Sequence, residues 1–180
     1  MTVEAPQSQI WQQLAAAYFG VLSLRAFEEW VYATEGLEAT IGHDGYLALI
    51  SQDYASKYAA GQVCASIDAL YLSRPTGELA RDGARWACRH FLAGTLALDD
   101  TASLLGQFWS EELPWARSEF AYINSELADM IPPEVYAQWE PEALADRLAE
   151  QDTRVREFHR AALEAAREIA TALEHLSAAF

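Results

Sequence analysis

The end of the chain carries the feature that most constrains its fold. From residue 141 onward, apolar residues recur at intervals of three and four positions, with one interval of seven, which places them on one face of an α-helix. They are Leu144, Leu148, Val155, Phe158, Ala162, Ala165, Ile169, Leu173, Leu176 and Phe180. Charged residues fill the other faces, and Glu150 and Arg154 are spaced to form an ion pair along the helix. The pattern predicts one continuous helix of roughly 28 residues, about 42 Å long.

A second, shorter pattern occurs twice, in YFGVLSLRAFEEWVY (18–32) and in LAGTLALDDTASLLGQFW (92–109). In each copy a glycine is followed two and four positions later by leucine. The matching residues are Gly20, Leu22 and Leu24, and then Gly94, Leu96 and Leu98. Glycine commonly ends a helix in a left-handed conformation, and Ser or Asp commonly caps the next helix, so we expect Ser23 and either Asp99 or Asp100 to be caps. Each copy is therefore predicted to form the corner of a helical hairpin.

The rest of the chain shows apolar residues at helical spacing and no sustained alternating run of the kind that forms β-strands. The predicted fold is all-α, a multi-helix bundle built from αα-hairpins with a long C-terminal helix. Pro75 and Gly77, in the turn-forming segment SRPTGE, mark the best internal boundary. We expect an N-terminal helical hairpin module at 1–74 and a C-terminal helical module at 75–180, packed together as one compact unit.

Charge is the strongest global signal. The sequence has 12 basic and 27 acidic residues, for a formal net charge of −15. Direct binding to nucleic acid or to an anionic membrane surface is disfavoured, because both depend on lysine and arginine. A basic protein partner would be attracted instead. Solubility is the alternative explanation for the excess of acidic residues.

The sequence favours a cytoplasmic protein. No apolar run approaches the length of a membrane span, and the N-terminal MTVEAPQSQIWQQ lacks the basic and apolar regions of a signal peptide. Cys64 and Cys88 have no metal or redox spacing, so we expect free thiols, with a disulfide between them as the alternative.

A search for catalytic or metal-binding patterns finds little. The four histidines, His43, His90, His159 and His175, lie far apart, and none is spaced to share a metal on one helical face. We therefore predict no catalytic residue, no metal site and no cofactor, and expect that the protein is not an enzyme.

One group of residues is basic, although the chain as a whole is acidic. Arg81, Arg85 and Arg89 recur at intervals of four and form a basic stripe along a predicted helix. We expect this stripe to face an acidic helix of the same chain, such as the one that bears Glu111 and Glu112. The alternative is a binding site for an external anion.

Two segments resemble known families. The segment YFGVLSLRAFEEWVY, with LEATIG and YLALISQDY after it, resembles the N-terminal pattern of small acidic bacterial immunity proteins, and its corner is similar to that of the colicin D-type immunity proteins. The later segment FAYINSELADMIPPEVYAQWEPEALADRLAEQD resembles an uncharacterised bacterial helical domain. The resemblance implies a cognate inhibitor that binds and blocks a toxin made by the same cell.

The leading hypothesis is therefore an immunity or antitoxin-type protein that neutralises a basic toxin through an acidic, aromatic-edged surface. The candidate partner-binding residues are Glu28, Glu29, Glu35, Glu38, Glu111, Glu112 and Trp115. For Trp30 and Trp109 we favour core packing. The alternatives are a cytoplasmic adaptor or chaperone-like protein with an apolar groove, and a small-molecule-binding protein or enzyme. The sequence predicts no oligomeric state.

Overall fold

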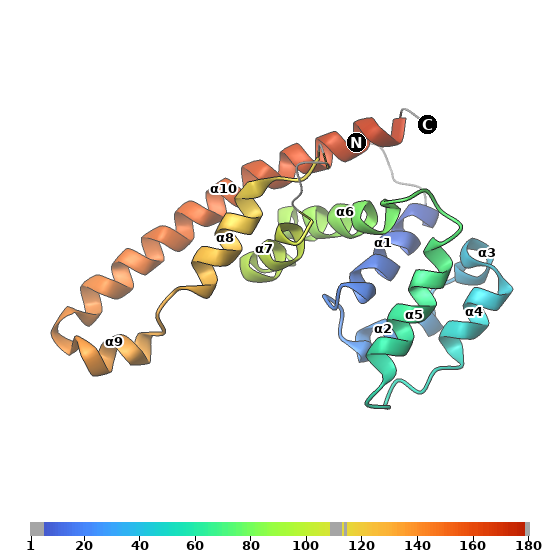
Figure 1. The fold of residues 1–180 in the computed structure, drawn as a ribbon, viewed down its shortest axis with the longest axis horizontal. Coiled ribbons are helices and arrows are strands. Elements are labelled where there is room, and N and C mark those ends of the chain that lie inside the picture. The colour runs from blue at the N-terminus through green and yellow to red at the C-terminus, as the bar shows by residue number, and fades with distance from the viewer. Residues whose placement is uncertain (1–5, 109–112, 114, 179–180) are drawn as a thin grey trace. The chain divides into compact units, whose positions relative to one another are not determined.

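The computed structural model describes residues 6–108, 113 and 115–178. Every regular element in these residues is a helix, which confirms the predicted all-α fold (Figure 1). The chain divides into two compact units, Met1–Trp86 and Ala87–Phe180.

The first unit is built around one apolar core. Its elements are α1 (Pro6–Tyr18), α2 (Leu24–Ala33), α3 (Leu37–Ile41), α4 (His43–Ile50), α5 (Ala59–Tyr71) and the first part of α6 (Glu78–Leu92). The central side chains are Leu14, Phe27, Leu37, Leu49 and Ile67, each almost fully buried and each from a different helix. Burial of such residues supplies most of the free energy that holds short helices together.

The division between the units falls inside α6, later in the chain than the boundary predicted at 74/75. The turn at Pro75–Gly77 does break the helices there, but it does not separate two packing units. The first two turns of α6 remain attached to the first unit, where the hydroxyl of Tyr71 contacts Asp82 and the indole N–H of Trp86 donates to Gln13. The turn-forming residues determine where the helix before them ends, whereas side-chain contacts determine the unit in which a helix packs.

The two glycine-containing corners have the same backbone geometry, one in each unit. Gly20 and Gly94 both adopt the left-handed conformation, with φ of 73° and 72°. The next residue donates its N–H to a carbonyl five positions back in each case, Val21 to Ala16 and Thr95 to His90. This is the Schellman arrangement that satisfies the last carbonyls of a helix.

The next helix begins at the same distance from the glycine in both corners. Ser23 caps α2, as predicted, and accepts a hydrogen bond from the N–H of Ala26. In the second corner the cap is Ala97, so the prediction of Asp99 or Asp100 as the cap is wrong. Both aspartates lie instead in the first turn of α7, where their negative charge interacts favourably with the positive end of the helix dipole. The repeated spacing from glycine to leucine therefore sets the corner, and the identity of the cap varies.

The second unit contains the last six residues of α6 and the rest of the chain. Its other elements are α7 (Leu98–Gly106), α8 (Ser118–Ala128), α9 (Pro133–Trp139), a 3-10 helix at Pro141–Ala143 and α10 (Leu144–Ala178). α7 and α8 approach closely at Gly106, where an added Cβ would lie 3.1 Å from the Cα of Ala121 and from the carbonyl oxygen of Phe120. Glycine is needed there because the backbone of α8 occupies the space.

The predicted C-terminal helix is present and longer than expected. It has 35 residues, or about 52 Å at the usual rise per residue. Its two halves differ sharply in burial. In the second half, Ala162, Ala166, Ile169 and Leu173 are all buried, whereas no described side chain between positions 124 and 161 is buried.

We refer to residues 124–161 as the arm. It comprises the end of α8, α9, the 3-10 helix and the first half of α10, with α8 and α10 side by side and α9 at their far end (Figure 1). Glu150 and Arg154, four positions apart, each pair with another residue: Arg154 reaches across to Glu126 of α8, and Glu150 lies 3.5 Å from Arg147. Spacing along one helix could not reveal the acidic residue on its neighbour.

Candidate functional site

The four acidic residues predicted in the first unit lie on or next to α2 and α3. Glu28 is half-buried, and Glu29, Glu35 and Glu38 are exposed. Arg25 donates to Glu29 at 3.0 Å, and a ring nitrogen of His43 lies 2.7 Å from Glu38. Exposed pairs of this kind are weak and exchange readily for a stronger partner. These carboxylates are therefore accessible to another protein.

An exposed tyrosine lies on α2 with two of these carboxylates, Glu28 and Glu29. Tyr32 is 59% exposed, one helical turn after Glu28 and shortly before Glu35. Its hydroxyl donates to the carbonyl of Ile50 at 3.1 Å, which anchors the tip of the side chain on α4. We name Tyr32 with Glu28, Glu29, Glu35 and Glu38 the α2–α3 surface.

The other residues predicted to contact a partner are Trp115, Glu111 and Glu112. Trp115 is only 2% exposed and packs edge-to-face on Phe108, with ring centroids 5.9 Å apart. Its predicted place at a binding rim is therefore wrong, because the ring belongs to the core of the second unit. Trp30 is half-buried and stacked on Phe27, in line with its expected packing role. Glu111, Glu112 and Trp109 lie outside the described residues.

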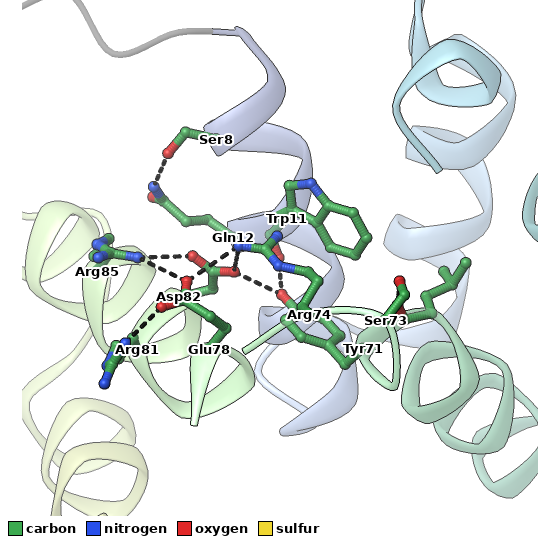
Figure 2. Close-up of polar contacts among 11 residues, drawn as sticks. Ser8, Trp11, Gln12, Tyr71, Ser73, Arg74, Glu78, Arg81, Asp82 and Arg85 are labelled. Carbon is green, nitrogen blue, oxygen red and sulfur yellow. Dashed lines mark hydrogen bonds and ion pairs between the residues drawn. The ribbon is translucent and has the colours of Figure 1, made fainter. Parts of the chain in front are cut away.

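The basic stripe forms part of a buried ionic cluster in the first unit (Figure 2). Its charged members are Arg74, Glu78, Arg81, Asp82 and Arg85, and each is at most one quarter exposed. Arg81 donates to Glu78 at 2.7 Å, and Arg85 donates to Asp82 at 3.0 Å. These two hydrogen-bond acceptors lie on the same helix, three residues before each arginine, and Arg85 also lies 3.7 Å from Glu78. Arg89, the third member of the stripe, is exposed near the end of α6.

Sequence reasoning missed this cluster although its signal is visible. In ELARDGAR, the pattern acid, two residues, arginine occurs twice in succession, which places both pairs on one helical face. The fifth member, Arg74, comes from the preceding turn and contacts both Glu78 and Asp82. Its guanidinium also lies 4.2 Å from the ring centre of Trp11, so α1 forms one wall of the cluster.

Asp82 is the most deeply buried charge of the cluster, at 2% exposure. Burial raises the pKa of its carboxyl above the ordinary value, while Arg74, the hydrogen bond from Tyr71 and Arg85 oppose that rise in pKa. The Tyr71 oxygen lies 2.9 Å from both Asp82 and the carbonyl of Trp11. A hydroxyl has one proton, so Tyr71 donates to both only in alternation, and a protonated Asp82 would itself donate to Tyr71.

The role of this cluster is structural, because it joins three segments of the first unit. Glu78 lies near three arginines, and Asp82 near two, so the two carboxylates offset most of the charge of the three partly buried guanidinium groups. The same residues join α1, the turn after α5 and the start of α6 (Figure 2). The alternative of an external-anion site is therefore not needed to explain why Arg81 and Arg85 lie on one face.

Among the described residues, three of the exposed large apolar side chains lie on the arm, which the site prediction did not include, and the others are Tyr32, Leu47, Tyr58, Leu72, Leu92 and Tyr122. Trp139, at the end of α9, is 71% exposed, and Ile131 and Leu148 are also exposed. The signal was present in PPEVYAQWEPE, where two prolines confine a tryptophan to a helix of seven residues. A helix this short has little surface against which to bury such a ring.

Cys64 and Cys88 are free thiols. Within the described residues, no group of three or more His, Cys, Asp or Glu side chains is placed to hold a metal ion. None of the described helices is both long and apolar enough to cross a membrane. Comparison of the chain with protein-family models, curated proteins and solved structures gave no significant match. Function therefore has to be inferred from the geometry of this chain alone.

Proposed function

We propose that this chain binds and neutralises a positively charged protein, in the manner of an immunity or antitoxin-type inhibitor acting on a cognate toxin. The formal net charge of −15 would attract a basic protein over distances longer than a contact and would raise the rate of encounter. This role also agrees with what the resemblance to acidic immunity proteins implies.

The observation that carries the proposal is the α2–α3 surface. It combines exposed carboxylates with Tyr32, whose ring is open to solvent while its hydroxyl is held by the backbone of α4. A tyrosine fixed in this way loses little side-chain entropy on binding, and aromatic anchors of this kind dominate interface energies. The carboxylates around it would pair with lysine or arginine of the partner.

The direct test is neutralisation. The protein encoded by the neighbouring reading frame would be expressed with and without this chain, and cell growth and complex formation would be measured. We expect a basic neighbour whose toxicity this chain suppresses by forming a stable complex. A neighbour that is harmless, or one that is toxic but neither bound nor suppressed, would contradict the proposal.

A matched pair of variants tests the surface itself. The double substitution Glu29→Gln and Glu35→Gln removes two exposed charges beside Tyr32 and should weaken binding about three- to tenfold, mainly through a slower association rate. The control is Glu164→Gln with Glu174→Gln, which removes two exposed carboxylates from α10 and should leave the affinity unchanged. Surface plasmon resonance would give both rates.

One observation favours a second candidate, an adaptor or chaperone-like protein that binds through apolar surface. The arm carries ten large apolar residues, and none of them is buried. Unburied apolar surface on this scale commonly marks an interaction site. Binding that is insensitive to salt would favour this candidate over the first.

A further inference from the structure

The arm is a two-layer structure with no third layer over its apolar residues within the described chain. Its large apolar members are Leu127, Met130, Ile131, Val135, Tyr136, Trp139, Leu144, Leu148, Val155 and Phe158. All are half-buried or exposed. In the same helix, the apolar residues of this spacing are buried from Ala162 to Leu173. The periodicity that builds the core of the second unit therefore continues into the arm, where its residues are not buried.

The arm has a defined shape, because contacts between its helices fix their register. The side-chain amide of Gln151 donates to the carbonyl of Ile131 at 2.8 Å, and Arg154 pairs with Glu126. Phe158 meets Tyr122 edge-to-face, with centroids 6.1 Å apart. A surface held in one geometry loses little conformational entropy on binding, which favours a specific partner over nonspecific adhesion.

The three exposed apolar residues of the arm lie at the end where α9 meets the start of α10. Glu140 pairs with Arg147 at 3.2 Å, and these residues are the sequence neighbours of Trp139 and Leu148. Gln151, one turn after Leu148, is bonded to the backbone of Ile131. Trp139, Leu148 and Ile131 therefore lie at the same end of the arm, and we name these three residues together the arm patch.

Charge around the patch identifies the kind of partner. Residues 124–161 contain nine acidic residues against four arginines. Three of those arginines, Arg147, Arg154 and Arg156, already pair with acidic residues of the arm. Asp129, Glu134, Glu142 and Asp146 have no ion pair within the described part of the chain. A second copy of this chain would bring the same negative charge to the contact, so a basic partner is favoured over self-association.

We infer that the arm patch is a docking surface for a basic amphipathic helix of the partner, which lies along the arm and supplies the missing third layer. Its apolar face would cover Trp139, Leu148 and Ile131, and its lysines or arginines would meet the unpaired carboxylates. Laying one apolar helical face on another is a common mode of recognition between proteins. The inference rests on the proposed function, because it takes the partner to be basic.

The test uses the full chain and three synthetic helical peptides of about 18 residues, or five turns. One has leucines at intervals of three and four with lysine elsewhere, one has the same composition in an order that destroys this spacing, and one has glutamate in place of lysine. Fluorescence anisotropy gives the affinities. We expect measurable binding only of the amphipathic lysine peptide.

Variants locate the binding site. Trp139→Ser with Leu148→Ser should weaken binding of the lysine peptide at least about tenfold, as expected for the loss of a buried aromatic anchor. Tyr58→Ser, at a tyrosine that is 64% exposed in the first unit, is the control and should change nothing. Hydrogen–deuterium exchange of the unmodified chain should show that the peptide protects residues 124–161, a readout that needs no variant to fold.

The outcomes separate the two proposals. If the lysine peptide binds but neither the arm variant nor exchange in the arm responds, the arm inference is overturned and the proposed function stands. Equal binding of all three peptides, or none, also overturns the inference, while the function is judged independently by neutralisation. Self-association abolished by the arm variant would overturn it in favour of a second copy as the occupant.

Discussion

At the scale of single residues, the ionic cluster is the most consequential feature of the first unit. Asp82 is buried beside Arg74 and accepts hydrogen bonds from Arg85 and Tyr71, so removal of its side chain would leave these donors without their acceptor. Removing one partner of a buried pair costs about 3 kcal/mol of unfolding free energy. Asp82→Ala should show a loss of that size in chemical denaturation at neutral pH, whereas Asp44→Asn, at an exposed position, should change stability by less than about 0.5 kcal/mol.

The pH dependence of stability provides a second prediction for the same residue. The folded chain raises the pKa of Asp82 above its ordinary value of 3.8, so between that value and the raised pKa the folded state holds a proton that the unfolded state releases. The contribution of Asp82 to the free energy of unfolding is therefore largest below pH 3.8 and falls as the pH rises through the raised pKa. In Asp82→Asn this component should disappear when thermal unfolding is followed across pH. An unchanged pH profile would show that Asp82 titrates in the folded protein as it does in the unfolded chain.

The structural roles of some residues could be predicted from the sequence around them, and the roles of others could not. Ser23 as a cap and Trp30 as a packing residue followed from local pattern. Trp115 did not, because its burial depends on Phe108 and on the packing of α7 and α8, which are set by contacts between helices. Asp82 was missed because a sequence does not show which acid of an acidic chain is buried.

At the scale of elements, the junction of α7 and α8 depends on the absence of one side chain. Gly106→Ala would gain about 1 kcal/mol of helix propensity but would place a Cβ 3.1–3.2 Å from three backbone atoms of α8. Backbone atoms cannot move aside as a flexible side chain does, so we expect a net loss of about 1–2 kcal/mol of unfolding free energy. Thermal denaturation would measure it, with Gly61→Ala in α5, where an added Cβ meets nothing within 4 Å, as the control that should be neutral or stabilising.

Within α10, the contrast in burial predicts a contrast in dynamics. Backbone amides in the first half, before Ala162, should exchange with deuterium faster than those from Ala162 to Leu173, because fewer buried side chains oppose local opening there. Uniform protection along the helix in the free chain would contradict this. The sequence predicted the existence and face of α10 because three-and-four spacing is a local property. It could not predict that only half of the face is covered, since coverage depends on what packs against it.

At the scale of the whole molecule, the all-α class and the repeated corners could be predicted, whereas the division of the chain could not. The units separate between Trp86 and Ala87, within a continuous helix that no turn signal interrupts. Charge is the property of the whole molecule on which the functional account depends. The α2–α3 surface and the arm patch both place aromatic side chains among acidic residues, and both would serve a partner of opposite charge.

The most direct test of this account is the salt dependence of binding to the partner identified by neutralisation, measured by calorimetry from low to high sodium chloride concentration. Exposed charges are strongly screened once the Debye length falls from about 10 Å at 0.1 M to about 3 Å at 1 M salt. We predict a dissociation constant that rises at least about tenfold over that range, with a smaller rise for the variant with Glu29→Gln and Glu35→Gln. A dissociation constant that stays constant across the range would contradict the claim that negative charge directs this protein to its partner.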